Sequence, residues 1–162
     1  MTDRAPRAAL ADALGLLGRR DFTEAALRER LLKRDHDEAS VEDAVAKCVD
    51  YGYVDDHAWG MARAAELFRR RPVGRPALLH DLRRYGLAPT MAEQVADEAY
   101  AGHGGERAVL ADALERWVAG KGTPAEWRSI RSCSGHLQRR GFAAGDIQAA
   151  LSPWLDKLGT RG

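Results

Sequence analysis

Apolar and polar residues recur with helical spacing along almost the whole chain. Short segments carry apolar residues three or four positions apart, as at Val41, Val45 and Cys48, and a glycine or proline follows most of these segments. Good helix formers dominate, whereas β-branched and aromatic residues are sparse. The pattern predicts an all-α fold of about nine short helices.

Side chains typical of helix caps mark where several of these helices begin. Thr23, Asp37 and either Asp55 or Asp56 each stand ahead of a helical pattern, where their oxygens can accept from free backbone N–H groups. Residues 123–126 read TPAE, which predicts a capping box and a helix running from there to Arg140.

The last helix is predicted to begin near Ala144. Pro153 lies inside its pattern and lacks the N–H that a helix interior uses. We therefore expect this helix to be bent or broken there.

One short motif occurs twice and a degenerate copy precedes it. HDLRRYGL spans 80–87, GHLQRRGF spans 135–142, and RLLKRDH spans 30–36. Their aligned turn positions, Asp35, Gly86 and Gly141, are separated by 51 and then 55 residues. Such spacing predicts tandem three-helix (helix-turn-helix-like) units over 1–55, 56–103 and 104–162.

The motif predicts a left-handed turn after the second helix of each unit. Gly86 and Gly141 tolerate this geometry, and Leu87 and Phe142 are expected to fold back onto the core. In the first copy Asp35 replaces the glycine, and aspartate adopts left-handed geometry better than most residues.

Charge is unevenly distributed although the net charge is only +1. Residues 1–60 carry 9 Lys and Arg against 13 Asp and Glu, residues 61–90 carry 7 against 2, and residues 91–162 carry 9 against 9. A basic centre beside an acidic first third favours a polyanionic or acidic partner.

The basic centre is the candidate partner-binding site. Its residues 68–87 read FRRRPVGRPALLHDLRRYGL. Arginine suits bidentate recognition of carboxylate or phosphate, although a charge run is also the ordinary composition of a solvated helix face. Arg139 and Arg140 extend this surface under the same two interpretations. The candidate contacts are Arg69, Arg70, Arg71, Arg75, Arg83 and Arg84.

The sequence lacks the motifs of common catalytic, nucleotide and zinc sites. Asp55 and Asp56 fit a helix cap better than a metal site, His103 is expected in a solvated loop, and Cys48 in the core. Cysteines without metal or disulfide spacing favour a reduced, cytoplasmic setting. We expect neither a signal peptide nor a membrane span.

The aromatic turn Tyr51-Gly52-Tyr53 has two interpretations. Exposed tyrosines can stack on bases, but tyrosines at a junction between helices more often cover the core. We expect packing.

Three stretches of the chain resemble the RecX family, the regulators of the RecA recombinase. They are residues 27–62, which contain YGYVDD, residues 74–87 and residues 134–151. Each motif is short, and their order and separation make the match specific over most of the chain. Asp35-His36 replaces the glycine and aromatic residue of the family's first turn.

The resemblance implies an elongated, curved array of these units. Such a protein acts by binding, not as an enzyme, and needs no cofactor. Members of this family bind in the groove of the RecA–single-stranded DNA filament, bridge protomers, and inhibit ATP hydrolysis and strand exchange. This implies a negative regulator of recombination, DNA repair and the SOS response, expected to be a monomer. Arg71, Arg75, Arg83 and Arg84 are the preferred contacts.

Two other functions stay open at this point. A helix-turn-helix-like DNA-binding protein would carry basic residues on a recognition helix, and the first unit here is acidic. A helical-repeat scaffold would bind some other partner. The residues leave open which unit contacts RecA, whether filament ends are capped or the groove filled, and whether bare DNA is bound weakly.

Overall fold

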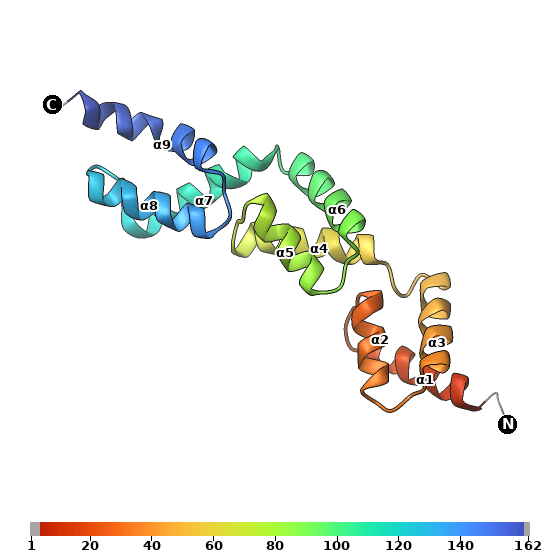
Figure 1. Ribbon diagram of the computed structural model, residues 1–162. Coiled ribbons are helices and arrows are strands. Elements are labelled where there is room, and N and C mark those ends of the chain that lie inside the picture. Colours follow the sequence, from red (N-terminus) through yellow and green to blue (C-terminus); the bar gives the residue numbers. More distant parts are fainter. Residues whose placement is uncertain (1–3, 161–162) are drawn as a thin grey trace. The chain divides into compact units, whose positions relative to one another are not determined.

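The computed structural model describes residues 4–160, and within that range it holds nine α-helices and no strand (Figure 1). The all-α prediction is confirmed. Its elongated, curved shape stays a prediction. The helices are α1 (Arg4–Leu17), α2 (Glu24–Leu32), α3 (Glu38–Asp50), α4 (Asp56–Arg70), α5 (Arg75–Arg84), α6 (Pro89–Gly102), α7 (Glu106–Lys121), α8 (Trp127–Arg139) and α9 (Ala144–Gly159).

Backbone contacts divide the chain into two compact units. The first contains Met1–Ala62 with Leu82–Ala92, and the second contains Arg63–Asp81 with Glu93–Gly162. The three helices of the middle repeat therefore contribute to both units. The boundaries predicted for the three repeats stay a prediction.

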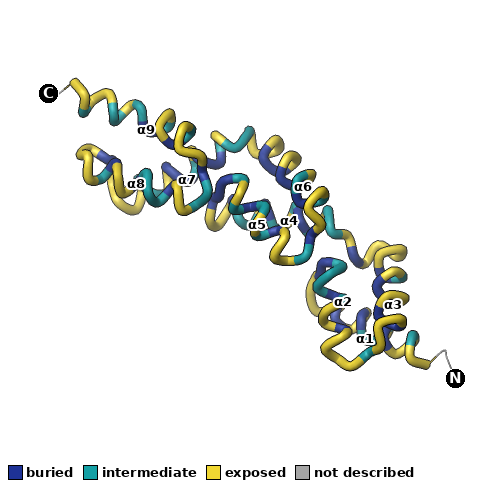
Figure 2. Tube along the Cα trace, viewed as in Figure 1, coloured by how far each residue is buried: buried dark blue, intermediate teal, exposed yellow. Residues whose placement is uncertain are grey.

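The first unit has a core built from the apolar stripes that the sequence pattern predicts. Helix α1 packs along α3, and α2 packs against both. Each helix buries its apolar face and leaves its opposite face exposed, as the colours of Figure 2 show. The core residues are Ala9, Ala13, Leu16, Phe22, Leu27, Leu31, Val41, Ala44, Val45, Cys48 and Val54.

Three predicted caps are present. The Thr23 hydroxyl accepts from the N–H of Ala26 at 3.1 Å, and Asp37 accepts from the N–H of Ser40 at 3.0 Å. Asp55, the residue before α4, accepts from an N–H in the first turn of that helix at 3.0 Å. These side chains satisfy backbone donors that a helix start otherwise leaves free, which is why the three helices begin where they do.

The capping box predicted at 123–126 is wrong. Helix α8 begins at Trp127, and Glu126 precedes it in an extended conformation with no hydrogen bond from its side chain to the cap. Pro124 is buried although its neighbours are exposed. Burial of this proline against the protein holds the segment out of the helix, so the helix starts three residues later than proline at a first helical position would predict.

Helix α9 is not broken at Pro153, contrary to one part of the expectation. It is continuous from Ala144 to Gly159 with the proline inside. Proline lacks the N–H that would donate to the carbonyl of Ala149. The hydroxyl of Ser152 donates to that carbonyl at 2.8 Å instead, which reduces the cost of the missing bond.

The second helix of each repeat ends in the predicted left-handed turn. The φ angles are 64° at Asp35, 101° at Gly86 and 89° at Gly141. In all three turns, the residue after the turn donates its N–H to the carbonyl of the leucine five positions earlier. Leu87 and Phe142 are buried as expected.

The glycine turns also join one repeat to the next, and we call this contact the inter-repeat joint. In the first unit, the Thr23 hydroxyl donates to the carbonyl of Tyr85, directly before Gly86, at 2.6 Å. The N–H of Glu24 donates to the Asp56 carboxylate at 2.8 Å. The first residues of α2 are thereby held by the turn after α5 and by the start of α4.

The second unit contains the same joint one repeat later. The N–H of Gly74 donates to the carbonyl of Arg140 at 2.8 Å, and the N–H of Arg75 donates to Glu106 at 3.0 Å. Gly74 and Arg75 lie 51 residues after Thr23 and Glu24, which is the spacing of the sequence repeat. The repeated motif thus encodes a repeated contact.

The joint explains why glycine stands in two turns and aspartate in the other. A Cβ on Gly86 would lie 2.6 Å from the Cβ of Ala25, and one on Gly141 would lie 2.9 Å from the Cβ of Ala77. Asp35 adopts the same backbone geometry, but its side chain is exposed. Close approach between repeats, rather than the left-handed turn alone, therefore demands the glycine.

Alanine at Gly86 should destabilise the protein more than alanine at Gly52. Gly52 has a similar φ of 78°, but its Cβ would meet nothing within 4 Å. We expect Gly52→Ala to cost about 1 kcal/mol of unfolding free energy and Gly86→Ala about 3 kcal/mol, because only the second adds a clash. Urea denaturation followed by circular dichroism measures both values.

Ala25→Gly provides the matched second mutation. In a double-mutant cycle it should recover about 1–2 kcal/mol in the Gly86→Ala background, because it removes the atom that clashes. Equal costs at Gly52 and Gly86, without coupling to Ala25, would contradict this account of the joint.

Candidate functional site: arginines at the ends of helices

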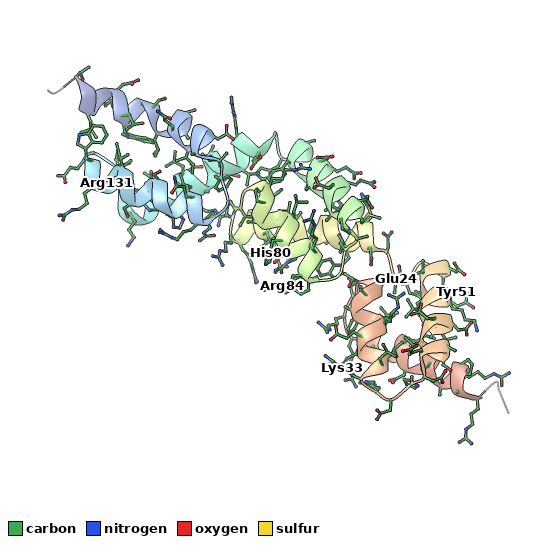
Figure 3. The ribbon with its side chains drawn as sticks, in the orientation of Figure 1. Glu24, Lys33, Tyr51, His80, Arg84 and Arg131 are labelled. Atoms are coloured by element: carbon green, nitrogen blue, oxygen red, sulfur yellow. The ribbon has the colours of Figure 1, made fainter. Side chains whose placement is uncertain are left out.

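The six predicted arginines lie at the end of α4, directly after it, and at the two ends of α5. Arg69 and Arg70 lie in the last turn of α4, Arg71 follows it directly, and all three are exposed. Arg83 and Arg84 end α5 and are also exposed; Figure 3 labels Arg84 there. The first three belong to one compact unit and the last two to the other.

The side chain of Arg75 is held by two carboxylates. Its guanidinium pairs with Glu93 at 2.5 Å and with Asp97 at 2.7 Å, both on α6. The hydrogen bond to Glu93 is the main cause that raises its pKa above the ordinary arginine value. Arg75 thus fastens the start of α5 to α6, and a partner would have to compete with two intramolecular ion pairs.

A denser group of positive charge lies within the second unit. We call Arg71, Arg116, His136, Arg139 and Arg140 the basic cluster. Arg116, on α7, donates to the carbonyls of Arg69 and Arg70 at the C-terminal end of α4. A guanidinium at this position also interacts favourably with the negative end of the helix dipole. The contact brings α7 to the end of α4.

Burial and neighbouring arginines lower the pKa values of two cluster members, His136 and Arg140. Burial is the main cause that lowers the pKa of His136, followed by the charges of Arg140, Arg139 and Arg71. Burial likewise lowers the pKa of Arg140, followed by Arg71 and Arg116. Nearby like charges disfavour each other's protonated forms, which accounts for the arginine contributions to both shifts.

Within residues 4–160, none of the five cluster members forms an ion pair with a carboxylate. Nearby Arg70, by contrast, pairs with Glu66 at 3.2 Å. The cluster therefore has unmatched positive charge, and this is the property expected of a surface that binds an anion.

Sequence reasoning found part of this cluster. Arg71 was a predicted contact, and Arg139 and Arg140 were considered as an extension of the same surface. Arg116 and His136 were missed. Arg116 lies on α7, and only packing brings it to the end of α4, so no local signal marks it. His136 lies one helical turn before Arg140 within the motif at 135–142, and this spacing could have identified it.

The other candidate groups have structural roles. Asp56 holds the inter-repeat joint, and burial raises the pKa of its carboxyl. In the described part of the chain, no three His, Cys, Asp or Glu side chains gather as a metal site. Cys48 and Cys133 are buried free thiols, and burial raises the pKa of Cys133 to about 11. His103 is exposed, pairs with Asp112 at 2.7 Å and lies against a phenylalanine ring.

The packing role expected for Tyr51 and Tyr53 is wrong. They are 60% and 59% exposed, and their rings contact each other edge to face at 6.1 Å. Val54, which is 3% exposed, fills the core at this junction. The left-handed Gly52 reverses the chain so that the two tyrosines flank it on the surface.

The fold and the basic cluster together define a helical-repeat protein with a charged surface. A family model described as "RecX, first three-helix domain" matches residues 9–48. The regulatory protein RecX of Syntrophotalea carbinolica is 36% identical over 143 residues, covering 86% of this chain and 92% of the relative. That of Pelodictyon phaeoclathratiforme is 32% identical, covering 93% and 91%. The chain belongs to the RecX family of regulatory proteins.

Solved structures agree on the fold. The crystal structure of RecX from Lactobacillus salivarius superposes with a TM-score of 0.78 at 14% identity, covering 95% of this chain and 98% of that one. A second RecX crystal structure gives 0.73 at 18% identity, covering 94% and 72%. Among residues 4–160, no helix has the length and apolar character to span a membrane.

Removing one charge from the cluster should change the titration of His136. Arg71→Gln is expected to raise the pKa of His136 by roughly half a unit, because one neighbouring positive charge is lost. Arg131→Gln removes a charge from α8 itself, but Arg131 is not among the groups that shift His136. It is therefore the matched control. Histidine NMR signals followed against pH measure both; equal shifts would contradict the geometry of the cluster.

Proposed function

We propose that this protein is a negative regulator of RecA. It binds the groove of the RecA filament on single-stranded DNA and inhibits ATP hydrolysis and strand exchange. In this way it modulates recombination and DNA repair. The proposed activity is binding, without catalysis and without a cofactor, by a monomeric cytoplasmic protein.

Membership of the RecX family is the observation that carries this proposal. The relatives are regulatory proteins, and the match extends over most of their length. The repeated joint adds physical support, because it is a means of linking three-helix modules in series. A series of modules offers several weak contacts, and a filament offers repeated protomers, so avidity replaces a single tight site.

The exposed arginines are the proposed contacts with the filament or its DNA. Arg69, Arg70 and Arg71 belong to the second compact unit, and Arg83 and Arg84 to the first. Guanidinium groups form paired hydrogen bonds with carboxylates and phosphates, and both occur on a nucleoprotein filament. Arg75 is included as a contact, although a partner would have to compete with its ion pairs to Glu93 and Asp97.

Steady-state ATP hydrolysis by RecA on single-stranded DNA tests the proposal. The protein is titrated from well below to equal the RecA concentration, at low salt and with the cognate RecA. Inhibition far below equal concentrations indicates end capping or disassembly, and inhibition only near equal concentrations indicates groove binding. Unchanged hydrolysis would contradict the proposal and favour a DNA-binding or scaffold function.

Charge-reversal variants test the contacts in each compact unit. We expect Arg71→Glu with Arg139→Glu, and separately Arg83→Glu with Arg84→Glu, to raise the concentration for half-inhibition about tenfold, because attraction becomes repulsion. Arg19→Glu with Arg30→Glu makes the same change in net charge at exposed positions of the acidic first repeat and should have little effect. Circular dichroism confirms that helicity is kept. Equal losses in all three variants would indicate net charge rather than a defined surface.

A further inference from the structure

The backbone forces the basic cluster together. The segment before α5 and the turn after α8 are in direct contact: the N–H of Gly74 donates to Arg140, and a Cβ on Gly74 would overlap the carbonyl oxygen of Gly141. Arg71 comes three residues before Gly74, and Arg140 immediately precedes Gly141. The backbone positions of Arg71 and Arg140 therefore stay near each other while the inter-repeat joint is closed.

Neighbouring contacts hold both sides of this arrangement in place. Pro72 and Val73 are buried, and the hydroxyl of Tyr100 donates to the carbonyl of Val73 at 2.8 Å. On the other side, Arg116 holds the end of α4 through two carbonyl groups. These contacts fix the backbone on both sides of the cluster, so an anion that bridges Arg71 and Arg140 need not bring two separate segments together.

The composition of the cluster favours a phosphate group over a single carboxylate. Guanidinium groups from Arg71, Arg139 and Arg140 arrive from two separate segments. A tetrahedral phosphate presents oxygens in several directions and can accept from both segments together, whereas one planar carboxylate is satisfied by a single fork. His136 adds a ring that becomes a donor at both nitrogens when it is protonated.

We propose that Arg71, Arg139, Arg140 and His136 form a binding site for a phosphate group, and that His136 takes up a proton from solvent when the phosphate binds. In the free protein, burial and the three arginines keep the imidazole neutral. A bound anion offsets the arginine charges and favours imidazolium. Protonated His136 in turn strengthens the attraction for the anion, so phosphate and proton bind cooperatively.

The charged groups around His136 support an increase in its pKa when an anion binds. Arg139 and Arg140 act on it from its own helix and Arg71 from the segment after α4, while Arg116 acts on Arg140 from α7. All four are positive and remain charged at every accessible pH. Within residues 4–160, His136 has no ion pair with a carboxylate, so an added anion is the change that reverses the field at the imidazole.

Histidine NMR on the intact wild-type protein tests the proposal without RecA. The pKa of His136 is measured alone, with a short oligothymidylate and with inorganic phosphate, at fixed ionic strength. We expect either ligand to raise it by about one unit, which corresponds to about tenfold tighter binding below the pKa than above it. An unchanged His136 with both probes, under conditions where binding is saturated, would overturn the site.

The two probes distinguish the source of the phosphate. Much tighter binding of the oligothymidylate assigns the site to the phosphodiester backbone of single-stranded nucleic acid. Equal affinity for inorganic phosphate, counted per phosphate group, assigns it to a small phosphorylated molecule.

Variants supply a second readout. Oligothymidylate affinity should rise about tenfold between about pH 8 and about pH 6 in the wild type, and His136→Gln should abolish this rise while binding at the higher pH persists. His80→Gln is the control, because His80 is exposed on α5 and does not act on the cluster. A pH dependence that survives in His136→Gln would contradict proton uptake at this residue. Since RecA is absent throughout, these outcomes are independent of whether RecA is inhibited.

Discussion

A carbonyl group ahead of a left-handed glycine holds each repeat to the helix of the repeat before it. Tyr85 and Arg140 provide these carbonyls, and the residues that donate to them, Thr23 and Gly74, stand at equivalent places before α2 and α5. A donor on a side chain serves one joint, and a backbone N–H serves the other. The position of the acceptor is thus what the repeat preserves, and the chemistry of the donor is free to differ.

Contact at the inter-repeat joint also explains where the local structures of the repeats differ. Leu31 and Leu82 come seven residues after the first residue of their helices, whereas Leu137 comes ten after the first residue of α8. The extra turn of α8 includes Trp127 and occupies the positions from which the other two helices form a joint, so α8 does not present the same surface. Asp35 differs for a related reason: its side chain is exposed, so the left-handed backbone geometry is the constraint that the structure shows there.

Features encoded by neighbouring residues were predictable from the sequence. A cap such as Asp37 acts on an N–H three residues away, and a left-handed turn depends on the residue that adopts it, so local patterns contain both. The errors arose where distant contacts decide the outcome. Burial of Pro124 delays α8, and Val54 fills the space expected for two tyrosines. The meeting of Arg116 with the end of α4 depends on how three helices pack, and no spacing in the sequence records it.

The joint also connects the architecture to the candidate site. The motif places arginines one or two positions before each turn glycine, as Arg140 precedes Gly141 and Arg84 precedes Tyr85-Gly86. The turn packs against the preceding repeat, so those arginines lie on backbone that is held in place at the boundary between modules. At the second joint the end of α4 supplies Arg71 from the opposite side, and unpaired charge accumulates there. A glycine selected by close packing thereby determines where positive charge gathers, so that structure and binding depend on the same few residues.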